Sequence, residues 1–84
     1  MTLHLIFNPQ GLVSCLQRRD PADPMVLLGD GTYALTQSDI ECFVLSEDAA
    51  ARGVTGNSKN IRSIDYAELV ELSMNHSPVV SWAD

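Results

Sequence analysis

The stretch PMVLLGDG, residues 24–31, contains the apolar run that decides the fold. Four apolar residues follow one another without polar alternation at Met25–Leu28, and the run stops at Gly29-Asp30-Gly31. A short, continuous apolar run of this kind is typical of a strand that is buried on both faces of a parallel sheet. We therefore expect a buried strand here, and helices on both faces of its sheet.

Similar short apolar runs recur along the chain and alternate with helical patterns. The expected strands lie at residues 3–7, 25–28, 40–45, 61–64 and 79–82. Strands that alternate with helices form βαβ units with right-handed crossovers. The prediction is one α/β domain over residues 1–84, a small sandwich with a mostly parallel sheet of about five strands.

Three of the connections have helical spacing and a fourth is too short for a full helix. The expected helices cover residues 11–19, a segment capped by Ser46 and closed by Gly53, and residues 65–76 capped by Asp65. Ser and Asp are common N-caps, and Gly commonly ends a helix. TYALTQ, residues 32–37, allows at most a helical turn or two. Asn8-Pro9 is interpreted as a turn that closes the first strand.

The last of these helices, DYAELVELSMNH, has the most regular pattern. Tyr66, Leu69, Val70 and Met74 follow one another at helical spacing. They are expected to form an apolar stripe along one face of the helix.

Composition excludes several classes of function. The net charge is −6, and the five basic residues form no stripe, so direct binding of nucleic acid is not expected. No window approaches the ~18 apolar residues of a membrane span, and no targeting segment is recognisable at the N-terminus. Two cysteines make neither a disulfide framework nor a metal site. The pattern is that of a cytoplasmic protein with reduced thiols, without metal or cofactor and without a membrane partner.

Ligand sites in such folds lie at the carboxyl ends of the strands, where loops meet helices. Four stretches are expected there: 8–11, 29–32, 46–48 and 65–66. The GDG at 29–31 lacks a dinucleotide fingerprint and a P-loop lysine. It is therefore interpreted as a tight turn with Asp30 as helix cap, although a phosphate cradle is the other reading. Ser14, His4 and His76 suggest no catalytic triad.

The two cysteines differ in what their surroundings allow. Cys42 lies within an apolar strand and is interpreted as a small buried residue. Cys15 has Leu12 and Leu16 beside it, which favours burial, but Arg18 and Arg19 follow one turn later and nearby cations favour a thiolate. Burial is expected to prevail, so that the Cys15 thiol reacts slowly.

The ordered segments LHLIFNP, VLLGDGTYA, FVLSEDAAARGVTG and SIDYAELVEL, with a terminal SW, resemble the TusB/DsrH family over essentially the whole chain. The resemblance implies a flavodoxin-like, DsrEFH-like three-layer sandwich. It also implies assembly with TusC/DsrF-like and TusD/DsrE-like subunits into a sulfur-relay complex. Complexes of the TusBCD type serve 2-thiolation of the tRNA wobble uridine, and those of the DsrEFH type serve sulfur oxidation.

Within the family, the resemblance leaves two roles open for this chain. In the first, it is a non-catalytic subunit and the TusD/DsrE-like partner carries the persulfide. In the second, it is a sulfurtransferase that uses Cys15, because Ser14-Cys15-Leu16 matches the S-C-L context of DsrH-like members. The segment TYALTQSDIECF, residues 32–43, is shorter than the family pattern by roughly a dozen residues, so its helix is expected to be truncated. Apolar ends at 3–7 and 79–82 predict self-association of the isolated chain.

Overall fold

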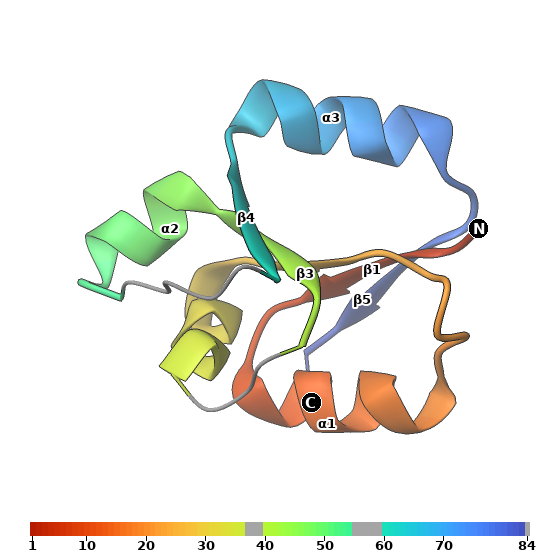
Figure 1. Ribbon diagram of the computed structural model, residues 1–84, viewed down its shortest axis with the longest axis horizontal. Coiled ribbons are helices and arrows are strands. Elements are labelled where there is room, and N and C mark those ends of the chain that lie inside the picture. Colours follow the sequence, from red (N-terminus) through yellow and green to blue (C-terminus); the bar gives the residue numbers. More distant parts are fainter. Residues whose placement is uncertain (37–39, 55–59, 84) are drawn as a thin grey trace.

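The computed structural model describes residues 1–36, 40–54 and 60–83, and contains one five-stranded sheet (Figure 1). Its strands are β1 (Leu3–Ile6), β2 (Met25–Leu27), β3 (Cys42–Leu45), β4 (Ile61–Ile64) and β5 (Val79–Trp82). Their order across the sheet is β4-β3-β2-β1-β5, and every neighbouring pair is parallel. The predicted parallel α/β sheet is confirmed.

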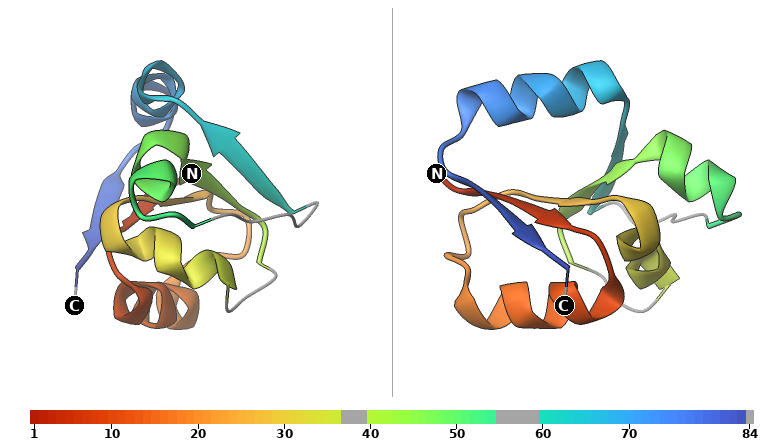
Figure 2. Two further views of the ribbon diagram at one scale, coloured as in Figure 1. Left: turned by 90° about the vertical axis from the view of Figure 1, so that its left-hand side faces the viewer. Right: turned by 180° about the vertical axis from the view of Figure 1, so that it is seen from behind.

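The helices cover both faces of this sheet and complete the three layers. They are α1 (Pro9–Arg18), the 3₁₀ helix η1 (Gly29–Thr36), α2 (Ser46–Ala51) and α3 (Tyr66–Asn75). Figures 1 and 2 show α1 and η1 on one face and α3 by itself on the other. The short helix α2 packs against η1 and β3.

The continuous apolar run of β2 supplies both halves of the core. Met25 and Leu27 belong to the cluster under α1 and η1, together with Cys15. Val26 and Leu28 belong to the cluster under α3. Because successive strand residues point to opposite faces, a strand covered on both sides has to be apolar at every position.

Helix α1 begins two residues earlier than expected. The Asn8 side chain accepts a hydrogen bond from the Gly11 backbone N–H at 2.6 Å, so Asn8 is the N-cap and Pro9 is the first helical residue. Proline suits this position, because it lacks the N–H that would have no partner there. Asn8-Pro9 is thus a helix start, and its interpretation as a separate turn is wrong.

The caps expected at Ser46 and Asp30 are also wrong. The chain passes directly from β3 into α2, so Leu45 holds the N-cap position without a side-chain hydrogen bond and Ser46 is already helical. Asp30 lies inside the first turn of η1, which starts at Gly29. Gly53 does follow the end of α2, and its φ of +64° is the left-handed conformation that closes many helices.

Helix α3 has the predicted cap but a different buried face. Asp65 and Glu68 form a capping box, with the Asp65 carboxylate accepting from the Glu68 N–H at 2.8 Å. Leu69 packs on the sheet together with Leu72, which was not part of the expected stripe. The other members of that stripe, Tyr66, Val70 and Met74, are exposed to solvent.

The order of the strands also corrects the expectation that both apolar chain ends, 3–7 and 79–82, supply exposed surface for self-association. Strand β1 is an inner strand, hydrogen-bonded to both β2 and β5, so Leu3 and Ile6 are fully buried. Of the two ends, only β5 lies at an edge of the sheet. None of the helices in the described ranges is long and apolar enough to cross a bilayer.

Candidate functional site

The carboxyl edge of the sheet, where a ligand crevice was expected, is filled by the protein's own side chains. The Gly29 N–H donates to Asp48 Oδ2 at 2.6 Å, which places a carboxylate from α2 in the turn where a phosphate would bind. Asp30 forms an ion pair with the Arg52 Nε at 3.0 Å, and the Thr32 hydroxyl donates to the Gly29 carbonyl at 2.9 Å. A second anion would be repelled by Asp48 and Asp30, so the GDG is a structural turn.

Two other expected stretches also use their polar groups for the fold. Asn8 caps α1, and the backbone at Gly31 lies against the carbonyl of Ile6 at the end of β1. Asp65 follows the edge strand β4 and caps α3. The structure therefore brings 8–11, 29–32 and 46–48 together at one edge, but as a set of satisfied caps and turns.

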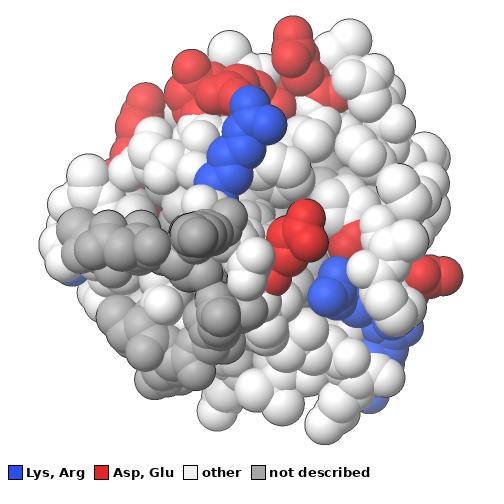
Figure 3. Space-filling model, in the orientation of Figure 1, with Lys and Arg blue, Asp and Glu red and all other residues white. Residues whose placement is uncertain are grey.

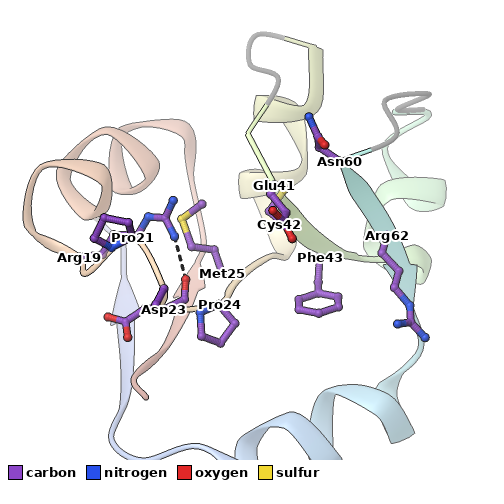
Figure 4. Close-up of a pocket in the computed structure, with 11 residues that line it drawn as sticks. Arg19, Pro21, Asp23, Pro24, Met25, Glu41, Cys42, Phe43, Asn60 and Arg62 are labelled. Carbon is purple, nitrogen blue, oxygen red and sulfur yellow. Dashed lines mark hydrogen bonds between the residues drawn. The ribbon is translucent and has the colours of Figure 1, made fainter.

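A hollow lies at the opposite edge, where β2, β3 and β4 begin (Figure 4). It has a volume of about 700 Å³. One wall comes from the connection between α1 and β2, including Arg19 and Asp23, and the other from β3 and β4, including Glu41 and Arg62. Its lining mixes two guanidinium groups with two carboxylates. The Arg19 Nη1 donates to the Asp23 carbonyl at 2.7 Å and so holds the first wall in place.

A buried polar network behind this wall joins three distant parts of the chain. The Trp82 indole N–H donates to His4 Nδ1 at 3.0 Å. His4 Nε2 lies 3.0 Å from Asp23 Oδ2, and the His4 side chain is almost completely buried. Since an indole nitrogen is only a donor, His4 accepts at Nδ1 and carries its proton at Nε2, which donates to Asp23.

This network stabilises the fold and leaves His4 unable to act as a general base. Both ring nitrogens are engaged, so His4 has no lone pair with which to take a proton from a substrate. Asp23 also accepts from the backbone N–H groups of Thr2 and Asp20. The His4 hydrogen bond is the main cause that lowers the pKa of the Asp23 carboxyl, with smaller contributions from these backbone donors.

Cys15 is completely buried on the inner face of α1, within the cluster that also contains Ile6 and Met25. Burial raises the pKa of the Cys15 thiol to about 11, although the Arg19 charge acts in the opposite direction. The other arginine, Arg18, lies over the Trp82 ring, with its guanidinium carbon 5.9 Å from the ring centroid. The Cys15 side chain is therefore a thiol at neutral pH, and its expected burial is confirmed.

Cys42 has the same character. It lies at the start of β3, is 8% exposed, and is also a free thiol. Burial raises its pKa to about 11 as well. Unlike Cys15, Cys42 is one of the residues that line the hollow in Figure 4. Both cysteines are thus buried and protonated, and no group of three or more His, Cys, Asp or Glu side chains within the described ranges could hold a metal ion.

Comparison with known protein families shows to which family the chain belongs. A family model described as DsrH like protein matches residues 6–79. The chain belongs to the DsrH family. Proteins named Protein TusB from Escherichia coli O81 (strain ED1a) and from Escherichia coli O6:K15:H31 (strain 536 / UPEC) are each 38% identical to it over 92 residues. Each alignment covers 96% of this chain and 97% of the relative.

These relatives are longer than this DsrH-family chain. An alignment of 92 positions exceeds the 84 residues available here, so the relatives contain residues that this chain lacks. Among the described residues, η1 is the helix that follows β2, and residues 37–39 of the segment that was expected to be shortened lie outside the described residues.

Solved structures support the fold. Protein Tm0979 from Thermotoga maritima, determined in solution by NMR, matches with a TM-score of 0.67 at 21% identity. The match covers 90% of this chain and 94% of that one. This chain and Tm0979 therefore share the same fold.

Two features of the site were missed by sequence reasoning. The His4–Asp23–Trp82 network joins residues up to 78 positions apart, and no local spacing predicts such a contact. The hydrogen bond between Asp48 and Gly29 joins two stretches that were both expected at the carboxyl edge. Their proximity could therefore have been predicted from the sequence.

Proposed function

We propose that this chain is a subunit of a cytoplasmic sulfur-relay complex, in which it is mainly structural and a TusD/DsrE-like subunit carries the persulfide. The complex would support 2-thiolation of the tRNA wobble uridine, since the relatives at 38% identity are named TusB. The alternative is a DsrH-like role in sulfur oxidation, since the matching family model is described as DsrH like protein.

The burial of both thiols is the observation that carries the structural role. Accepting sulfur requires a thiolate that can approach the sulfane sulfur of a donor persulfide. Cys15 has no exposed surface and its pKa is raised to about 11, so it meets neither condition in this conformation. At the carboxyl edge, the Asp48 carboxylate is engaged with the Gly29 N–H and the Asp30 carboxylate with Arg52.

The competing function is sulfur transfer by Cys15 itself. In that reaction the Cys15 thiolate attacks the terminal sulfur of a donor persulfide, a new S–S bond forms as the donor's S–S bond breaks, and the donor leaves as a thiolate. Sulfur is transferred without net oxidation. The reaction would require helix α1 to move away from β1 and β2, since these elements enclose Cys15.

Co-expression with TusC-like and TusD-like subunits tests the assembly. We expect the three chains to purify together, and the isolated chain to form a dimer or larger species at micromolar concentration. Large apolar side chains remain exposed on α1, α3 and β5, among them Val13, Val70 and Val79, and a small domain gains stability when such surface is covered. Size-exclusion chromatography with light scattering measures both properties. A strict monomer that retains neither partner would contradict the proposal.

A further inference from the structure

We propose that the exposed face of α3 is the surface on which this subunit binds a sister subunit, and that the partner presents an apolar patch bordered by Lys or Arg. The inference rests on the proposed function and adds to it the location and the chemistry of the contact. We call this surface the α3 stripe and define it as Tyr66, Val70 and Met74.

The α3 stripe is an apolar row that the fold leaves uncovered. Its three residues are spaced four apart, so they lie along one side of the helix. Tyr66 is 51% exposed, Val70 53% and Met74 78%. An aromatic ring and a methionine in such a row are typical of the side chains that anchor protein interfaces.

Helix α3 is also less well packed than α1 and α2. None of its residues is buried, whereas α1 buries Gly11, Leu12 and Cys15, and α2 buries Ala49. Figure 2 shows α3 alone above its face of the sheet. Beside it, between α3 and β4, lies a hollow of about 180 Å³ whose lining includes Phe43 and Leu72. A partner that covers the α3 stripe would add packing where the isolated chain has least.

Charge defines what kind of partner fits. Helix α3 and its cap carry Asp65, Glu68 and Glu71 and no Lys or Arg. Figure 3 shows acidic side chains at the upper edge of the molecule, with a basic side chain beside them. Arg62 of β4 lies near these acids, with its Nη2 3.9 Å from Glu68 Oε2. Glu71 lines the hollow and follows Val70 in the helix, so this acidic residue is adjacent to both the hollow and the α3 stripe. An apolar contact with a negative border is complementary to an apolar patch with a positive one.

The same charges argue against a second copy of this chain on the α3 stripe. A symmetric contact brings equivalent surfaces together, so the carboxylates of one α3 would face those of the other. Like charges at an interface disfavour the pairing. The self-association expected of the isolated chain is therefore assigned to other exposed apolar residues, such as Val13 and Leu16 on α1 and Val79 on β5.

Matched variants of the co-expressed complex test the location. Val70→Glu and Met74→Glu place a charge on the α3 stripe, and Val13→Glu places the same charge on an exposed valine of α1. All three positions are solvent-exposed, so the variants are expected to fold, which circular dichroism verifies. We expect each α3 variant to weaken partner binding at least about tenfold, because a charge buried in an apolar contact is strongly unfavourable. Val13→Glu is expected to leave it unchanged.

A charge reversal tests the chemistry of the partner. Glu71→Lys and Glu47→Lys change the net charge equally, but only Glu71 borders the α3 stripe, whereas Glu47 lies on α2. We expect Glu71→Lys to slow association and to reduce its sensitivity to salt, and Glu47→Lys to do neither.

The outcomes separate this inference from the proposed function. Partner binding lost in Val13→Glu but kept in both α3 variants would overturn the location, while the role in a complex would stand. Self-association lost in Val70→Glu, with partner binding intact, would assign the α3 stripe to a second copy. If the unaltered chain binds no sister subunit, both the inference and the proposed function are wrong.

Discussion

Gly31→Ala is expected to prevent stable folding, because the end of β1 leaves no room for a side chain there. A Cβ at this position would lie 2.9 Å from the carbonyl carbon of Ile6 and closer still to its oxygen. That oxygen already accepts a hydrogen bond from the Leu28 N–H at 3.0 Å, so the backbone cannot retreat without breaking the link between β1 and β2. We expect a loss of about 3 kcal/mol or more, a large part of the stability of a small domain.

Gly53→Ala is the matched control for this substitution. Gly53 has a φ of +64°, so alanine is strained there, but nothing lies within 4 Å of its added Cβ. The expected loss is about 1 kcal/mol, from backbone conformation alone. Urea unfolding followed by circular dichroism compares the two. Equal losses in both variants would show that the backbone at Ile6 and Gly31 is not closely packed.

His4→Phe is expected to lower the free energy of unfolding by about 2–3 kcal/mol, although the phenyl ring fills nearly the same space. The substitution removes the acceptor of the Trp82 N–H and the donor to Asp23, and so breaks the side-chain hydrogen bonds that join β1 to β5 and to the loop before β2. The other histidine provides the control. His76 Nδ1 donates to the Leu72 carbonyl at 2.8 Å at the end of α3, and His76→Phe should cost less than about 1 kcal/mol.

Acid titration of the unfolding midpoint gives a second readout of the same network. The His4 hydrogen bond lowers the pKa of Asp23 in the folded protein, so the stabilisation is complete above the ordinary Asp pKa of ~3.9. It is lost as the pH falls through the lower pKa of the folded state. We expect the unaltered chain to lose stability more steeply in this acidic range than His4→Phe. Equal acid sensitivity of the two would contradict the assigned hydrogen bond.

The fold was predictable because its signals are local. The apolar run at Met25–Leu28 and the regular alternation of strands and helices are sufficient for a parallel sheet, and the Asp65 cap and the Gly53 closure were predicted correctly. Errors arose where tertiary contacts compete with a local rule. Ser46 is a good N-cap by type, but β3 runs directly into α2 and leaves it no place outside the helix.

The buried face of α3 was less predictable for a related physical reason. Helical spacing showed an apolar row, but it cannot say whether that row faces the sheet or the solvent when a helix is apolar on more than one side. Leu69 and Leu72 face the sheet, and Tyr66, Val70 and Met74 do not. The network of His4, Asp23 and Trp82 depends entirely on the order of the strands, which places β5 beside β1.

The location of the persulfide tests the central claim most directly. The co-purified complex is incubated with a cysteine persulfide donor, and each subunit is examined by mass spectrometry for the added sulfur. We predict that the sulfur is found on the TusD-like subunit, that Cys15 and Cys42 stay unmodified, and that Cys15→Ser reduces relay only modestly, because both thiols are buried and protonated. A persulfide on Cys15, together with loss of relay in Cys15→Ser, would make this subunit a sulfur carrier and contradict the structural role.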